Sequence, residues 1–181
     1  MNLANKITII RVMMIPLFMI ILFSGYENSN YIAAAIFAIA SFTDSLDGYI
    51  ARSRNLVTTF GKFIDPLADK LLVSAALISL VQMDKIPSWI VVVIIAREFT
   101  ITGFRTIAAS EGITIAASPL GKIKTITQLI AIIALLLNNF PFTLINFPFD
   151  IIMLYVSLFF TVMSGIDYIY RNIHVLKSGD K

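Results

Sequence analysis

Six long apolar segments dominate this 181-residue chain and leave few folds open to it. They are residues 7–23, 31–52, 61–83, 89–110, 122–137 and 151–173. Each is close to the roughly 20 residues that an α-helix needs to cross a bilayer. The connections between them are too short to form a second domain. We therefore expect a single all-α domain over residues 1–181, an integral membrane bundle of six transmembrane helices.

The composition excludes an ordinary soluble domain. Hydrophobic residues make up 58% of the chain, and the mean hydropathy is +0.87, well above the soluble range. Arg11 inside the first segment and the lack of a small-residue cleavage pattern favour a retained helix over a signal peptide. The net charge of +3 is modest and clustered. It argues for membrane topology and anionic ligands and against a nucleic-acid partner.

The distribution of lysine and arginine predicts the orientation. Most basic residues lie on the side that holds the N-terminus, residues 52–62, residues 122–124 and the C-terminal tail, whereas the other side has little beyond Lys85. Because basic loops stay in the cytoplasm, we expect both termini there. The chain is then a multi-pass protein of the cell membrane.

Four aspartates interrupt the apolar pattern where the second segment ends and the third begins. They belong to the pattern D-x2-D-G-x2-A-R-x8-G-x3-D-x3-D, filled by Asp44, Asp47, Gly48, Ala51, Arg52, Gly61, Asp65 and Asp69. Within each pair the spacing is three or four residues, so each pair shares one helical face and the two can meet across a helical hairpin. Hard oxygen ligands without His or Cys favour Mg²⁺, with two ions expected and Mn²⁺ as a substitute.

Such carboxylates are costly within a membrane. One Asp at the centre of a transmembrane helix costs roughly 2.5 to 3.5 kcal/mol, so four unpaired ones would cost about 10 to 14. The alternative to a metal is a structural network with the nearby basic residues Arg52, Arg54, Lys62 and Lys70. That network does not need Gly48 and Gly61 at fixed offsets, whereas a site that admits a nucleotide and a pyrophosphate against the backbone does. We therefore expect a cytoplasm-facing metal site.

Basic residues in the fourth and fifth segments are the next candidates. Arg97 and Arg105 are eight residues apart, so they lie about 80° apart on a helix and can face one cavity. Lys122, Lys124 and the donors of a helix N-terminus make a credible phosphate site. Two alternatives stay open: Arg97 could pair with an aspartate of the hairpin, and the lysines could be ordinary positive-inside flanking. Glu98 adjoins Arg97 and is expected to face away from it.

The aspartate pattern resembles, at every defined position, the signature of the CDP-alcohol phosphotransferase family. Three flanking patterns are similar to those of bacterial phosphatidylglycerophosphate synthases within that family. They are N-x2-T-x2-R-x4-P, filled by Asn5, Thr8, Arg11 and Pro16, the segment 97–105, and G-K-x-K-T-x2-Q over residues 121–128. The first could also be a polar helix start that anchors at the interface, although the arginine fork suits a phosphate better than lipid.

The resemblance implies transfer of a phosphatidyl group from CDP-diacylglycerol to glycerol 3-phosphate, with release of CMP, in phospholipid biosynthesis. By position, Asp44, Asp47 and Asp65 would bind metal, and Asp69 would bind the second ion and act as the base. The donor site would comprise Asn5, Thr8, Arg11, Gly48, Arg52, Thr58 and Gly61. The acceptor phosphate would lie on Arg97, Arg105, Lys122 and Lys124. A homodimer is implied by family analogy alone.

Three alternatives differ in function. Within the family, the acceptor could be inositol phosphate, serine or phosphatidylglycerol. Outside it, intramembrane acids could line a divalent-cation transporter. A transporter needs a path that continues to the outer side, and the acids of the predicted spans lie in their cytoplasmic halves or, for Glu98, close to the middle. The third alternative is a purely structural membrane subunit.

Overall fold

The computed structural model describes the backbone of residues 3–53, 59–110, 113, 115 and 118–178, and the side chains of these residues except 3–8, 44–53, 59–67, 69, 110 and 173–178. Its helices are α1 (Leu3–Leu22), α2 (Ser29–Ser53), α3 (Thr59–Gln82), α4 (Ser88–Ser110), α5 (Pro119–Leu136), the short 3₁₀ helix η1 (Phe142–Ile145) and α6 (Phe149–Ser178). Every regular element in this described part of the chain is helical. The all-α prediction is confirmed.

The helix bounds differ from the predicted ones by three or more residues at three ends, and the first of these is the start of α1 at Leu3 rather than at residue 7. α5 begins at Pro119 rather than at residue 122, because Ser118 caps it: the Ser118 hydroxyl accepts from the Gly121 backbone N–H at 3.1 Å. Serine at the cap followed by proline is a preferred helix start. α6 continues to Ser178, beyond the predicted end at residue 173.

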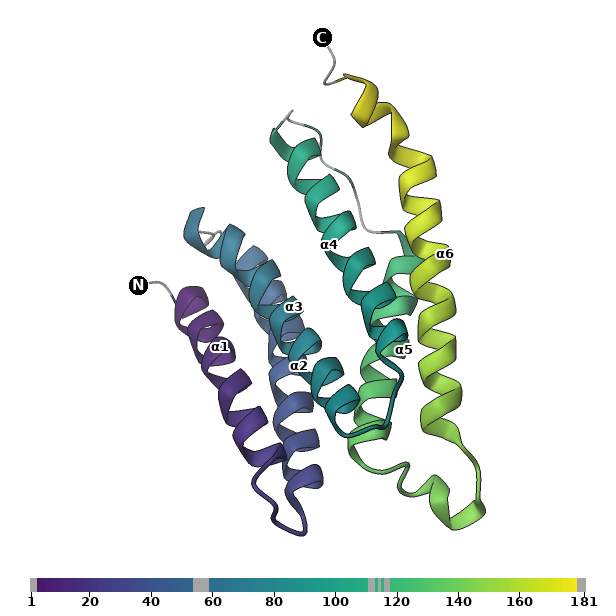
Figure 1. Ribbon diagram of the computed structural model, residues 1–181. Coiled ribbons are helices and arrows are strands. Elements are labelled where there is room, and N and C mark those ends of the chain that lie inside the picture. The colour runs from purple at the N-terminus through teal and green to yellow at the C-terminus, as the bar shows by residue number, and fades with distance from the viewer. Residues whose placement is uncertain (1–2, 54–58, 111–112, 114, 116–117, 179–181) are drawn as a thin grey trace.

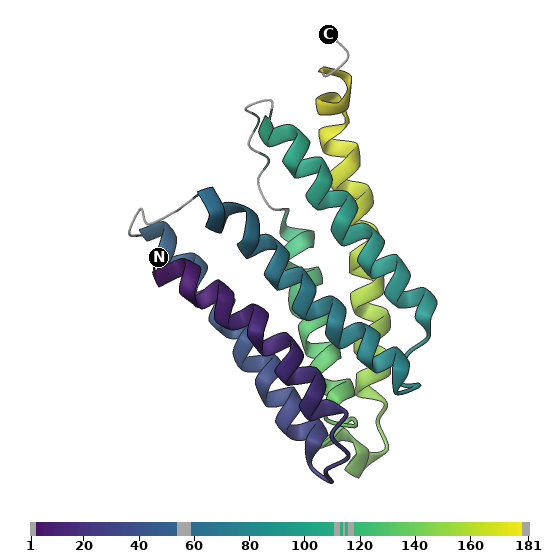
Figure 2. The same ribbon diagram turned by 60° about the vertical axis from the view of Figure 1, so that its left-hand side comes forward.

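The six α-helices run alternately up and down (Figures 1 and 2). α1 packs against α2 and α3, α6 packs against α4 and α5, and α2 packs against α5. The chain therefore starts and finishes at the same end of the bundle, which we call the terminus end. At the opposite end, the turn end, short connections join α1 to α2, α3 to α4 and α5 to α6.

The interior is filled by large aliphatic and aromatic side chains. Those with almost no exposed surface are Phe18, Phe37, Leu72, Leu77, Leu80, Ile90, Ile94, Ile132, Leu135, Leu136 and Leu154. The rings of Phe18 and Phe37 lie 6.2 Å apart between α1 and α2. Ala33, Ala34 and Ala40 of α2 are also buried. Such small residues let helices approach closely, as in membrane bundles.

The outer surface is strongly apolar. Exposed large hydrophobic side chains occur on all six α-helices, among them Met13, Ile39, Ile78, Val92, Ile126 and Ile166. By length and composition, two of the described helical segments could cross a membrane, Pro119–Leu136 and Phe149–Asn172. Shorter apolar segments are Ile9–Leu22, Ser29–Thr43 and Lys70–Gln82. The apolar surface agrees with a membrane protein, while six spans and their orientation stay predictions.

Lys85 forms hydrogen bonds between two segments at the turn end. Its ammonium donates to the Leu135 carbonyl and to the Asn138 side-chain oxygen, both at 2.7 Å. It thereby ties the connection between α3 and α4 to the last turn of α5, where a cation is also favoured by the helix dipole. Burial lowers the pKa of Lys85, and the nearby Asp150 carboxylate partly opposes that shift.

Candidate functional site

A pocket of about 530 Å³ opens between α4, α5 and α6, in the half of the bundle nearer the terminus end. We call it the basic pocket. Its polar and charged lining residues are Lys70, Arg97, Glu98, Thr102, Arg105, Ser118, Lys122, Thr125 and Tyr168. Three of the four predicted phosphate ligands, Arg97, Arg105 and Lys122, therefore line one pocket. The fourth, Lys124, does not belong to this lining.

Arg105 is held in place by Tyr168 of α6. The Arg105 Nε–H donates to the Tyr168 hydroxyl oxygen at 3.2 Å, and the guanidinium carbon lies 5.3 Å from the centre of the tyrosine ring. Tyr168 is itself buried and packs edge-on against Phe104, with ring centres 5.8 Å apart. The bond uses Nε, so the terminal nitrogens keep their donors for an anion. Sequence reasoning missed Tyr168, which no local pattern distinguishes.

The start of α5 forms one wall of the basic pocket. A Cβ atom at Gly121 would lie 3.3 Å from the Ser118 hydroxyl and 4.0 Å from Arg97 Nη2, so glycine leaves room there. The Gly121 and Lys122 N–H groups already bond to Ser118, at 3.1 and 3.2 Å. The helix therefore offers an anion its positive dipole, and the exposed Lys122 side chain, rather than these two backbone donors.

Arg97 is anchored more firmly than its position predicts. Its Nη1 lies 3.1 Å from the Glu98 carboxylate, and its Nη2 donates to the Ser164 hydroxyl at 2.9 Å. The expectation that Arg97 and Glu98 face apart is therefore wrong. Adjacent Cβ atoms diverge, but the long arginine side chain reaches back. Gly165 makes room for it, because a Cβ atom there would lie 3.2 Å from Arg97 Cγ.

Glu98 is the acidic centre of a group of cations. Besides Arg97, it forms an ion pair with Lys124 of α5, which is only 4% exposed. Thr102, one turn further along α4, donates to the Glu98 carbonyl at 2.7 Å and is hydrogen-bonded by Lys70 of α3. These interactions join α3, α4 and α5.

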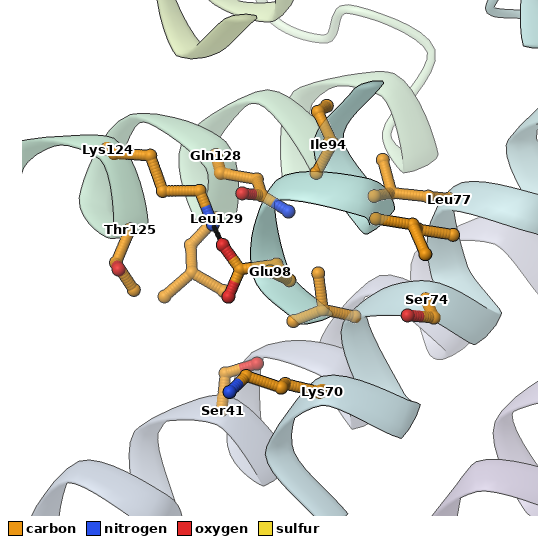
Figure 3. A pocket seen from close by; sticks show the side chains of 12 residues that line it. Ser41, Lys70, Ser74, Leu77, Ile94, Glu98, Lys124, Thr125, Gln128 and Leu129 are labelled. Carbon is orange, nitrogen blue, oxygen red and sulfur yellow. Dashed lines mark hydrogen bonds and ion pairs between the residues drawn. The ribbon is translucent and has the colours of Figure 1, made fainter. Parts of the chain in front are cut away.

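A second, smaller cavity of about 100 Å³ lies deeper in the bundle, and we call it the inner cavity (Figure 3). Its polar lining residues are Ser41, Lys70, Ser74, Glu98, Lys124, Thr125 and Gln128. It shares Lys70, Glu98 and Thr125 with the basic pocket, so the two spaces adjoin. Lys124, the fourth predicted phosphate ligand, belongs here.

The four aspartates of the predicted metal site lie at the terminus end. Asp44 and Asp47 are near the end of α2, and Asp65 and Asp69 near the start of α3. Their side chains are not among the described ones, so their roles as ligands, and that of Asp69 as the base, stay predictions. Among the described residues, no group of three or more His, Cys, Asp or Glu could hold a metal ion.

The predicted donor-site residues lie at the same end. Arg11 has a described side chain, which is only 4% exposed on α1. The others with a described backbone are Asn5 and Thr8 in α1, Gly48 and Arg52 in α2, and Gly61 in α3. Thr58 lies outside the described residues. The helices thus gather these positions at one end, while their contacts stay untested.

The backbone suits a carboxylate metal centre. α2 and α3 pack against each other and carry both aspartate pairs toward the same end of the bundle (Figures 1 and 2). The donor set consists of carboxylate oxygens, which Mg²⁺ prefers. By position and donor chemistry, Asp44, Asp47, Asp65 and Asp69 fit a magnesium centre.

Known proteins resemble the chain over nearly its whole length. The family model described as CDP-alcohol phosphatidyltransferase matches residues 1–163. The chain is 52% identical to a Bacillus subtilis protein named CDP-diacylglycerol-glycerol-3-phosphate 3-phosphatidyltransferase, over 99% of both chains. It is 38% identical to a Rickettsia typhi protein of that name, over 92% of this chain and 94% of that one. A Mycobacterium tuberculosis protein named probable phosphatidylglycerophosphate synthase is also 38% identical, over 94% of this chain and 81% of its own.

Proposed function

The chain belongs to the CDP-alcohol phosphatidyltransferase family, and we propose that it transfers the phosphatidyl group of CDP-diacylglycerol to glycerol 3-phosphate, releasing CMP. The curated relatives whose names contain both substrates match the chain almost from end to end. The product is phosphatidylglycerophosphate. The proposed role is therefore in phospholipid biosynthesis.

The basic pocket is the observation that carries the choice of acceptor. Glycerol 3-phosphate brings a phosphate with nearly two negative charges, and Arg97, Arg105, Lys122 and the dipole of α5 converge on one space. Serine has no phosphate, and the phosphodiester of phosphatidylglycerol carries only one charge. The pocket therefore matches the phosphate monoester better than either of these alternatives.

A membrane location is supported by the apolar surface on all six helices. A soluble monomer rarely exposes large apolar side chains on every one of its helices. In the proposed topology, all six α-helices span the cell membrane and the terminus end faces the cytoplasm, since Lys122, Lys177 and the other basic residues of the short connections lie at that end. The basic pocket would then open toward the side from which a soluble acceptor arrives.

In the proposed reaction, the acceptor hydroxyl oxygen attacks the phosphorus that bears the diacylglycerol. A bond forms between them, the bond from that phosphorus to the oxygen of CMP breaks, and CMP leaves. Asp69 takes the hydroxyl proton, and the basic pocket orients the acceptor by its phosphate. The chemistry expected of two Mg²⁺ ions at Asp44, Asp47, Asp65 and Asp69 is neutralisation of charge on the pyrophosphate.

The residues for the donor are proposed by position in the family pattern. Asn5, Thr8, Arg11, Gly48, Arg52, Thr58 and Gly61 would bind CDP-diacylglycerol. All belong to α1, α2, α3 or the adjoining connection, whereas the basic pocket is formed mainly by α4, α5 and α6. Donor and acceptor would thus approach the aspartates from two halves of the bundle. The homodimer stays a prediction.

An acceptor assay tests the proposal. Purified protein with CDP-diacylglycerol and Mg²⁺ is offered labelled glycerol 3-phosphate, inositol phosphate, serine or phosphatidylglycerol, and lipid products are separated. We expect label in phosphatidylglycerophosphate and release of an equal amount of CMP. Preferential incorporation of another alcohol would replace glycerol 3-phosphate as acceptor. No transfer to any alcohol, with Mg²⁺ transport into vesicles instead, would support the transporter.

A further inference from the structure

The inner cavity contains buried polar groups without a partner in the described part of the chain. Gln128 of α5 is 3% exposed, yet neither its Oε1 nor its Nε2 has a hydrogen-bond partner. Ser41 of α2 is 8% exposed, and its Oγ also has none. Both line the cavity, from opposite sides (Figure 3). Because buried polar groups are normally satisfied, these atoms indicate a polar ligand.

The chemistry of the cavity favours an uncharged hydroxyl. An amide offers both donors and an acceptor, and a serine hydroxyl does so as well, so together they complement a group that both donates and accepts. Of the charged side chains that line the cavity, Lys124 and Glu98 form an ion pair and offset each other, and the Lys70 ammonium donates to the Thr102 hydroxyl. A phosphate would find its cations in the basic pocket instead.

The position of the cavity places it on the acceptor's path. It joins the basic pocket at Lys70, Glu98 and Thr125. Lys70 directly follows Asp69 in α3, and Ser41 precedes the first aspartate of α2 by three residues. A molecule with its phosphate in the basic pocket and its reacting hydroxyl at the predicted metal site would therefore lie along the inner cavity.

The cavity has room for part of such a molecule. Its volume of about 100 Å³ is several times the roughly 10 to 15 Å³ that one water needs on the same measure. A short hydroxylated carbon chain can therefore enter it. In glycerol 3-phosphate, the hydroxyl next to the reacting one lies midway between the phosphate and the reacting oxygen.

We propose that the inner cavity binds this middle hydroxyl of the acceptor, and that Gln128, with Ser41, makes the enzyme specific for an alcohol phosphate with two neighbouring hydroxyls. The Gln128 amide accepts from the hydroxyl through Oε1 and donates to it through Nε2. An acceptor without that hydroxyl leaves the amide buried and unpaired, which disfavours its transition state. The inference rests on the proposed function.

The test compares two acceptors in one assay. Glycerol 3-phosphate and 3-hydroxypropyl phosphate, which lacks the middle hydroxyl, are each varied with saturating CDP-diacylglycerol and Mg²⁺. We expect the wild type to prefer glycerol 3-phosphate by at least about tenfold in kcat/KM, since sites built for a hydroxyl reject its deoxy analogue. Gln128→Met keeps the side-chain length but removes both polar atoms. It should bring the ratio to within about threefold, mainly by loss of glycerol 3-phosphate turnover.

Ser79→Ala is the matched control. Ser79 is fully buried in α3, and its Oγ also has no partner in the described structure, but it lines neither cavity. Its substitution should leave the ratio unchanged. Should Gln128→Met not fold, Ser41→Ala gives the same comparison.

Three outcomes would overturn the proposal. Equal use of both acceptors by the wild type means that no side chain distinguishes an acceptor with the middle hydroxyl from one without it. If Gln128→Met lowers kcat/KM by the same factor for both acceptors, Gln128 contributes only to packing. If the wild type uses neither acceptor but uses another alcohol, the proposed function fails and the inference fails with it.

Discussion

Lys85 at the turn end and Arg105 near the terminus end are both cations in an apolar bundle, but their surroundings differ. Lys85 donates to a helix carbonyl and an asparagine side chain and lines neither the basic pocket nor the inner cavity. Arg105 has one nitrogen bonded to Tyr168 and lines a pocket of about 530 Å³. Lys85 joins parts of the bundle, whereas Arg105 lines an open space and is a predicted ligand of the acceptor phosphate.

The same contrast separates the two ends of the bundle. At the turn end, polar groups pair locally: Asn139 donates to the Phe147 carbonyl at 2.7 Å and accepts from the Asp150 N–H at 3.2 Å. Near the terminus end, the cavities contain polar atoms of Gln128 and Ser41 that the described chain leaves unpaired. An unsatisfied polar atom points to a site only where it also lines a cavity, because Ser79 near the turn end is buried and, among the described residues, unsatisfied as well but lines neither cavity.

The largest effect is expected at the aspartates. Asp69→Asn should lower turnover by about 10² to 10⁴, the typical contribution of a general base, while CDP-diacylglycerol binding largely survives. Excess EDTA should abolish turnover and Mg²⁺ restore it. The control is Asp84→Asn, an exposed aspartate at the turn end, which should keep full activity. More than about a tenth of the wild-type rate in Asp69→Asn would remove its role as base.

Arg105→Ala tests the cation that we propose binds the acceptor phosphate. A charge-assisted hydrogen bond contributes roughly 1.5 to 3 kcal/mol, so kcat/KM for glycerol 3-phosphate should fall about 10- to 150-fold while the KM for CDP-diacylglycerol stays nearly constant. Arg171→Ala is the control, because Arg171 is largely exposed and pairs with Asp167 of its own helix at 2.6 Å. A selective defect with the donor would mean that the acceptor pocket is wrongly placed.

Lys85→Met tests the structural cation. Its two bonds involve a charged donor, but Lys85 is half-exposed, so we expect a loss of about 1 to 2 kcal/mol. For a chain of this size that corresponds to a decrease in Tm of about 2 to 8 °C. Thermal unfolding in detergent measures it, and kcat/KM for both substrates should not change. A selective kinetic defect for one substrate would contradict the interpretation that the turn end is structural and that substrates bind near the terminus end.

Tyr168→Phe separates positioning from binding. The ring and its packing on Phe104 remain, but the oxygen that accepts from Arg105 is lost. The bond has a charged donor, but its loss affects the acceptor only through the position of Arg105, so kcat/KM for glycerol 3-phosphate should fall roughly 2- to 10-fold, less than in Arg105→Ala. In an Arg105→Ala background the same change should have no further effect. Additive losses would show that Tyr168 acts independently of Arg105.

The smallest effect is the pH dependence from Lys85. Burial lowers its pKa below the ordinary 10.5 in the folded state, so the unfolded chain binds the proton more strongly. Stability from this group therefore rises with pH between the lowered pKa and 10.5. The difference in Tm between wild type and Lys85→Met should increase from about pH 7 toward pH 10. A constant difference would mean that the pKa is not shifted.

Local pattern was enough to predict the helices and several residues that line the basic pocket. Apolar runs predicted six α-helices, because burial and backbone hydrogen bonding in such runs leave no other regular structure. The Arg97 and Arg105 spacing correctly predicted a shared cavity. Gln128 was noticed only as part of a family pattern, and Tyr168 not at all, since their roles depend on partners far along the chain.

For Lys122 and Lys124, the sequence predicts their positions on the helix, but their surroundings depend on the tertiary structure. The sequence determines that both lie in the first turns of α5, and helical geometry sets them about 200° apart, so they cannot share a face. Only the packing of α4 and α6 decides the rest: Lys122 is exposed beside the basic pocket, and Lys124 is buried against Glu98. The physical reason is that a local pattern sets only the direction in which a side chain leaves its own helix. Which neighbouring helix lies in that direction depends on packing between residues that are far apart in the sequence.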